Sequence, residues 1–98
     1  MRALLKKPGA TPEIIEIENS LKAFQAAVGG FIETVTIAED AAIVCNEEGR
    51  LFRLPYNCVF MGIDFVGPIL IVGVDGDEFC DVPQDSIVWI LSYRKERR

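Results

Sequence analysis

The sequence predicts an α+β fold, with a mostly antiparallel sheet of about five to six strands and one principal helix, at about residues 19–29, packed on one face. Three observations predict this. One segment alone has helical spacing of apolar residues between a cap and a glycine pair, and several short β-branched segments are separated by turns. The chain has 98 residues, 50% of them hydrophobic and 26% charged, which is typical of a single globular domain spanning 1–98.

The first two strands are expected at residues 2–5 and 13–17. The segment between them reads KKPGATP, and its prolines and glycine favour a turn over continued strand. The two strands should therefore form a hairpin.

The principal helix follows directly. Asn19 is the expected N-cap, with Ser20 as the alternative one position on. Gly29-Gly30 ends the helix, because glycine adopts the left-handed conformation after a helix without steric cost. One face of the helix is expected to be buried through residues at i, i+3 and i+7, namely Leu21, Phe24 and Val28.

Three strands are expected next, at residues 31–37, 41–45 and 50–54. The first alternates with a period of two and is rich in β-branched residues. Turns at Glu39-Asp40 and at residues 46–49 separate the strands, with Gly49 expected at positive φ.

The C-terminal third contains one clear element and two open ones. Residues 69–74 are apolar without alternation, which predicts a central strand covered on both faces. Residues 58–65 are ambiguous. Residues 82–93 are predicted as helix or strand: Asp81 and Gln84 have capping-box spacing, whereas residues 87–91 have strong β content. The helix is favoured.

The composition excludes several function classes. The chain has no histidine, so a Ser/His/Asp or Cys/His nucleophile and a histidine metal site are absent. The carboxylates at residues 75–81 do not have EF-hand spacing, and the Glu47-Glu48 pair lies on one turn. We therefore expect no catalytic residue, no metal site and no cofactor.

Charge and cysteine usage indicate the environment of the protein. The net charge is −5, and residues 8–93 carry three basic residues against 14 acidic ones. Direct nucleic-acid binding is therefore not expected. A basic tail closes the chain at residues 94–98. The three cysteines cannot all pair and lack metal spacing, which predicts reduced thiols and a cytoplasmic protein, and no segment suits a membrane span.

Four residues are the candidate binding residues. Tyr56 and Asn57 follow Pro55 in a loop and are expected to be exposed, and Arg50 and Arg53 precede them. Tyrosine and arginine are enriched in the residues that dominate binding energy at interfaces.

The sequence also resembles a known family. Residues 16–33 read EIENSLKAFQAAVGGFIE, and the later motifs VCNEEG, LPYN and IVGVDG follow in order at residues 44–49, 54–57 and 71–76. These resemble motifs of domain-of-unknown-function family 3846. The resemblance implies a small protein of bacteria, phages or mobile elements, from a family with no established general activity.

These observations lead to three hypotheses. The first is a non-enzymatic phage or mobile-element accessory protein that binds and inhibits or sequesters a host protein, with an anti-CRISPR-like inhibitor as one form. The alternative is a binder or sponge for a small nucleotide signal, with arginines on its phosphates. An enzyme acting through carboxylate, cysteine or tyrosine is the lesser alternative. The apolar run at residues 87–91, followed by the basic tail, further predicts a homodimer.

Overall fold

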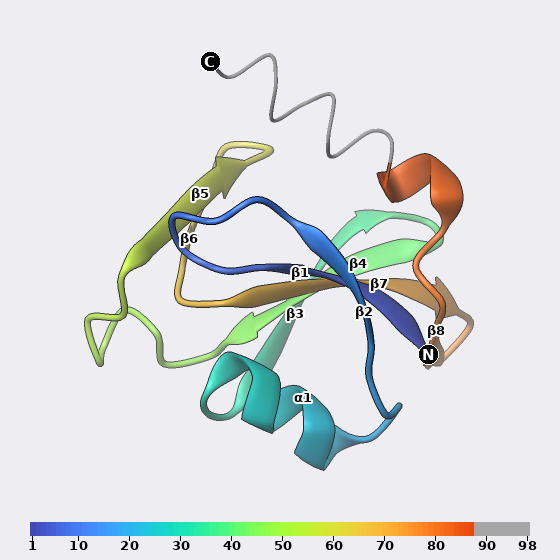
Figure 1. Ribbon diagram of the computed structural model, residues 1–98, viewed down its shortest axis with the longest axis horizontal. Helices are drawn as coiled ribbons and strands as arrows, with labels where there is room; N and C mark the ends of the chain where they lie inside the picture. Colours follow the sequence, from blue (N-terminus) through green and yellow to red (C-terminus); the bar gives the residue numbers. More distant parts are fainter. Residues whose placement is uncertain (88–98) are drawn as a thin grey trace.

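The structure, a computed structural model, describes residues 1–87 (Figure 1). Within these residues no helix is long and apolar enough to cross a lipid bilayer. The elements follow one another in the order β1 (Arg2–Lys6), β2 (Glu13–Glu16), α1 (Leu21–Val28), β3 (Ile32–Ala38), β4 (Ala41–Asn46), β5 (Tyr56–Phe60), β6 (Ile63–Val66), β7 (Ile69–Asp75) and β8 (Glu78–Cys80).

Six of the strands form one antiparallel sheet. Its main order is β2-β1-β7-β4-β3, and β8 pairs with the end of β7. The strands β5 and β6 form a separate two-stranded hairpin. The α+β fold class and the single main helix are thus confirmed.

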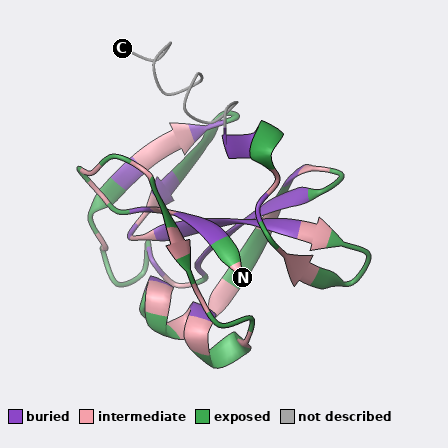
Figure 2. Ribbon diagram, turned by 45° about the vertical axis from the view of Figure 1, so that its right-hand side comes forward, coloured by how far each residue is buried: buried purple, intermediate pink, exposed green. Residues whose placement is uncertain are grey.

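The central strand β7 explains the layered architecture. Leu70 and Val72 pack toward α1, whereas Ile69 and Ile71 pack in the cluster on the opposite face. Both faces of β7 are therefore buried, as the absence of polar alternation predicted. Figure 2 shows this buried band through the middle of the molecule.

The second face of the sheet is covered by parts of the chain whose structure the sequence left open. Phe60 and Phe65 of the hairpin, with Val82 and Ile87, pack against it. The hairpin lies on the opposite side of the sheet from α1 (Figure 1). The ambiguous residues 58–65 belong to this hairpin, whose two-residue turn is made by Met61 and Gly62 at positive φ angles of 53° and 78°.

The C-terminal element begins as a helix. Residues 84–87 are helical, and the backbone N–H groups of Ser86 and Ile87 both donate to the Pro83 carbonyl. The favoured helix is thus observed at its start. The rest of the element and the basic tail at 94–98 lie outside the described residues.

The helix α1 differs from expectation at its first turn. Ser20 is the N-cap, and its Oγ accepts from the Ala23 N–H at 3.2 Å, whereas Asn19 donates its side-chain amide to the Phe79 carbonyl. Gly29 ends the helix at φ 85°, as predicted. Phe24 and Val28 are buried, but Leu21 is 58% exposed. Helical spacing thus identified the face that packs on the sheet, but it could not show that Leu21, at the first position of α1, stays exposed.

We expect Ser20→Ala to lower the free energy of unfolding by about 1 kcal/mol, because the Ala23 N–H loses its acceptor. Ser20→Asp should retain most of that stability, since a carboxylate both caps the helix and interacts favourably with its N-terminus. Urea unfolding of the three proteins measures the effect. Equal losses in both variants would contradict a capping role.

The strand expected at residues 50–54 is not formed. Residues 47–53 instead make consecutive turns, in which the Phe52 N–H donates to the Glu48 carbonyl and the Leu54 N–H to the Gly49 carbonyl. Gly49 is not at positive φ. A Cβ there would lie 2.9 Å from Val66 Cγ2, so close packing accounts for this glycine.

Candidate binding site

The four candidate residues lie in or beside one substructure, here called the hairpin lobe and comprising residues 47–66. Tyr56 is exposed, as expected, and Arg50 and Arg53 are exposed as well. Asn57 is only 8% exposed, so its prediction as a surface residue was wrong. The lobe therefore presents three of the four predicted side chains to solvent.

Asn57 is buried because it joins the lobe to the sheet. Its amide nitrogen donates to the Lys6 and Gly67 carbonyls at 2.8 and 2.7 Å, and its oxygen accepts from Lys6 Nζ at 2.9 Å. Lys6 Nζ also donates to the Lys7 carbonyl. The side chain thus makes hydrogen bonds that buried polar groups require, and its role is structural.

Asp64 brings two of the exposed candidates together. Arg50 Nη2 donates to the Asp64 carbonyl at 2.7 Å, and the Tyr56 hydroxyl donates to Asp64 Oδ1 at 3.4 Å. The Arg53 backbone N–H donates to the Arg50 carbonyl, and Arg53 has a φ of 55°. Asp64 was not among the candidate binding residues, because the structure of residues 58–65 could not be predicted from the sequence.

The lobe also exposes large apolar side chains that the sequence analysis did not single out. Leu51 and Phe52 are 73% and 63% exposed. Two large apolar residues next to each other after a turn can indicate an exposed apolar site. The segment 50–54 that contains Leu51 and Phe52 was instead expected to be a strand. The exposed large hydrophobic residues of the lobe are Leu51, Phe52, Tyr56, Met61 and Ile63.

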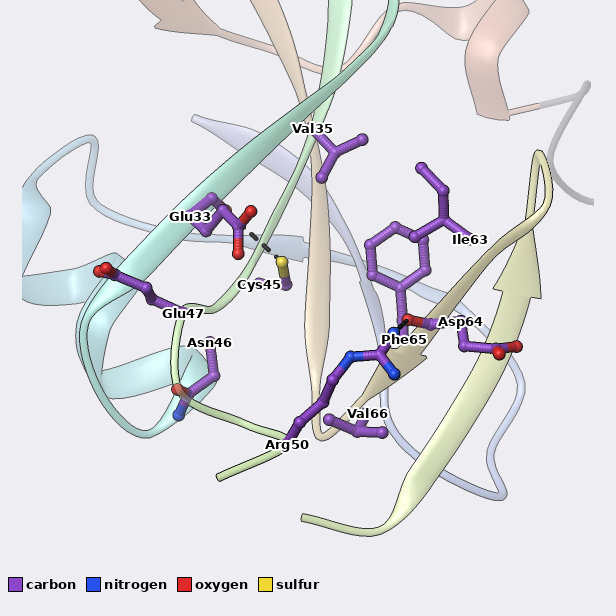
Figure 3. A pocket seen from close by; sticks show the side chains of 10 residues that line it. All are labelled: Glu33, Val35, Cys45, Asn46, Glu47, Arg50, Ile63, Asp64, Phe65 and Val66. Atoms are coloured by element: carbon purple, nitrogen blue, oxygen red, sulfur yellow. Dashed lines mark hydrogen bonds between the residues drawn. The ribbon is translucent and has the colours of Figure 1, made fainter. Parts of the chain in front are cut away.

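A small groove, here called the slot, opens between the lobe and the sheet. Its volume is about 170 Å³. Figure 3 shows Glu33 and Cys45 on the sheet side and Arg50, Ile63 and Phe65 on the hairpin side. The lining residues are Glu33, Val35, Cys45, Asn46, Glu47, Arg50, Ile63, Asp64, Phe65 and Val66.

Cys45 is the one cysteine that lines the slot. Burial, and then the nearby Glu33 carboxylate, raise the pKa of its thiol to about 11. Its Sγ donates to the Glu33 carbonyl at 3.6 Å. Cys45 is therefore a protonated thiol at neutral pH, which is the unreactive form toward electrophiles.

We expect the stability of the protein to fall above about pH 9, because the Cys45 pKa is higher in the folded chain than its ordinary value of 9.0. Such a group stabilises the fold fully below pH 9 and loses that contribution as pH rises toward 11. Urea unfolding between pH 7 and 11 measures this. Cys45→Val should flatten the alkaline limb, and an unchanged limb would contradict the assignment.

The remaining chemistry-bearing groups lie apart from the slot. Asp75, Asp77 and Glu78 are exposed at the turn between β7 and β8, and Cys80 lies beside them. Burial, and then Asp75, Asp81 and Asp40, raise the pKa of the Cys80 thiol. Among residues 1–87, no three His, Cys, Asp or Glu residues are grouped so that they could hold a metal ion.

Fold and site together define a small α+β protein whose antiparallel sheet is covered by a helix on one face and by an apolar-surfaced hairpin on the other. The chain belongs to the family described as Domain of unknown function (DUF3846), whose model matches residues 1–96. The resemblance of its motifs to this family is thereby confirmed. No curated protein and no solved structure matches the chain significantly.

Proposed function

We propose that this protein is a non-enzymatic, cytoplasmic binding protein that inhibits or sequesters a host protein by covering part of its surface. The observation that carries the proposal is the hairpin lobe, which exposes Leu51 and Phe52 in the same turn segment as Arg50 and Arg53, and Met61 at the turn between β5 and β6. Interface cores are enriched in aromatic residues, methionine and arginine. Exposed apolar groups gathered in one substructure are typical of interaction sites.

The lobe is also held firmly enough to act as a recognition surface. Arg50 ties its turn segment to Asp64, and Asn57 ties β5 to the sheet. The Gly67 N–H donates to the Pro55 carbonyl at 2.7 Å. A surface that is ordered before binding loses less conformational entropy when a partner docks, which favours affinity.

The charge of the chain favours a partner with a basic surface. The net charge is −5, and acidic residues outnumber basic ones in the body of the chain. Complementary charge accelerates association and selects the partner. A host protein with a basic functional surface, as in an anti-defence inhibitor from a phage or mobile element, fits this requirement.

The nucleotide alternative has weaker support from the slot. Drug-sized and cofactor-sized ligands usually occupy about 300–1,000 Å³, whereas the slot offers about 170 Å³. Glu33 and Glu47 line it and would repel phosphate groups. The protonated Cys45 thiol likewise gives an enzymatic reading little support.

Two exposed phenylalanines provide a matched test. Phe52 lies in the lobe and Phe31 precedes β3, and both are 63% exposed. Phe52→Ser and Phe31→Ser remove the same apolar area, so both should fold normally. We expect the wild type and Phe31→Ser to capture the same protein from host lysate, and Phe52→Ser to lose it by about tenfold or more. Equal capture by both variants would contradict the lobe as the binding surface, and no specific capture by the wild type would contradict the function.

A homodimer is a further proposal carried from the sequence. The apolar run behind it begins at Ile87, which is buried in the core, and continues outside the described residues. Light scattering should show a dimer for the intact protein and for a chain ending at Tyr93. A monomer at high micromolar concentration would contradict it.

A further inference from the structure

The slot combines an apolar lining with carboxylates. Val35, Phe65 and Val66 supply apolar surface. Glu33 of β3 and Glu47, which directly follows β4, lie on the same side of the slot (Figure 3). Glu33 opposes Cys45 across the β3–β4 ladder, which places its backbone directly at the slot. A ligand in the slot would contact both apolar side chains and carboxylates.

The two glutamates are not neutralised by the described part of the chain. Within residues 1–87, the structure gives an ion pair to the N-terminus and Glu16, and none to Glu33 or Glu47. Arg50, the one cation among the lining residues, donates to the Asp64 carbonyl on the hairpin side. In Figure 3 the Asp64 carboxylate points away from Glu33. The slot lining therefore contains three carboxylates and one guanidinium, and within residues 1–87 the two glutamates have no ion-pair partner.

The effect of that charge reaches the interior of the slot. Cys45 is buried at the slot wall, and Glu33 is the second cause of its raised pKa, after burial. The Glu33 carboxylate thus disfavours a second negative charge at that wall. The same field favours a positive charge placed there.

The volume and chemistry of the slot match one long cationic side chain. Lysine and arginine carry an aliphatic stem that packs on apolar surface and a charged head that stays with polar groups. An apolar side chain would desolvate the carboxylates without compensation, which costs free energy. We propose, building on the proposed function, that the slot receives one lysine or arginine side chain of the partner protein.

The position of the slot supports this docking mode. Ile63 belongs both to the slot lining and to the exposed apolar residues of the lobe. Arg50 lines the slot and directly precedes the exposed Leu51 in the same turn segment. A partner seated on the lobe would therefore bring its surface to the mouth of the slot, where one basic residue would set the register of the complex.

The test uses short peptides as probes and the intact ¹⁵N-labelled protein. The probe is acetyl-Gly-Gly-Arg-Gly-Gly-amide at millimolar concentration, and the controls replace arginine with citrulline or with glutamate. We expect the arginine peptide to shift the amide resonances of Glu33, Cys45 and Phe65. Citrulline, which has nearly the same shape without the charge, should shift them at least about tenfold less.

Glutamate-to-glutamine variants localise the effect. The double variant Glu33→Gln, Glu47→Gln should weaken binding of the arginine peptide by about tenfold. Glu39→Gln, at an exposed turn position just after β3, should leave binding unchanged. Absence of shifts, equal shifts with citrulline, slot shifts with the glutamate peptide, or equal effects of all the variants would each overturn the proposal.

The outcome is separable from that of the proposed function. If the captured host protein is lost with Phe52→Ser but bound equally by the Glu33→Gln, Glu47→Gln double variant, the lobe binds a partner and the slot proposal fails. If the lysate yields no partner, the peptide titration still decides whether the slot recognises a cationic side chain.

Discussion

Gly73→Ala is expected to lower the free energy of unfolding by about 3 kcal/mol, because the added methyl group has no space. A Cβ at Gly73 would overlap the Asp81 carbonyl oxygen and lie 2.9 Å from Cys80 Sγ. Gly73 pairs with Ala41 on one side and with Cys80 on the other, so the strand cannot shift without disturbing both ladders.

Urea unfolding measures this loss, and Gly9→Ala provides the control. Gly9 has a φ of 73° but nothing within 4 Å of an added Cβ, so its variant reports backbone strain without steric overlap. We expect that control to cost about 1 kcal/mol. If Gly73→Ala costs no more than Gly9→Ala, the contact between β7 and residues 80–81 is looser than the structure indicates.

Asn57→Ala is expected to destabilise the protein by about 3 kcal/mol, because it removes three buried hydrogen bonds at once. The Lys6 and Gly67 carbonyls each lose a donor in a place that water does not reach easily. Asn57→Asp should be at least as damaging at neutral pH. It preserves the shape and the contact with Lys6 Nζ but directs carboxylate oxygen at two carbonyl oxygens.

Asn19→Ala is the matched control for Asn57→Ala. Its side-chain amide donates one hydrogen bond, to the Phe79 carbonyl, in an exposed position. Water can replace that bond, so a loss of less than about 1 kcal/mol is expected. Thermal and urea unfolding compare the two variants, and similar losses would contradict the structural role assigned to Asn57.

The elements that the sequence predicted well depend on local chemistry. Gly29 ends α1 because the left-handed conformation favours glycine. The two prolines and the glycine of residues 7–12 favour the turn that joins β1 to β2. The uninterrupted apolar residues of β7 correctly predicted that both of its faces are buried. Each of these signals lies within a few neighbouring residues, where periodicity and turn preferences act directly.

Tertiary structure decided the elements whose partners lie far along the chain. Asn57 looked like a loop residue, yet it is buried because the Lys6 carbonyl, 51 positions away, requires a donor. Residues 50–54 have strand-like composition, but the contact of Arg50 with Asp64 and the packing of Gly49 against Val66 hold them in turns. The slot exists only because the hairpin folds back over the β3–β4 edge.

The sequence by itself therefore determined the α+β class, the main helix and the central strand, and three of its four candidate binding residues are exposed. It could not show that Glu33 and Phe65 line the same slot, or that a hairpin covers the face opposite α1. The physical reason is that burial of apolar residues leaves a periodic trace along the chain. A polar residue's surroundings, in contrast, are set by groups that only folding brings within hydrogen-bonding distance.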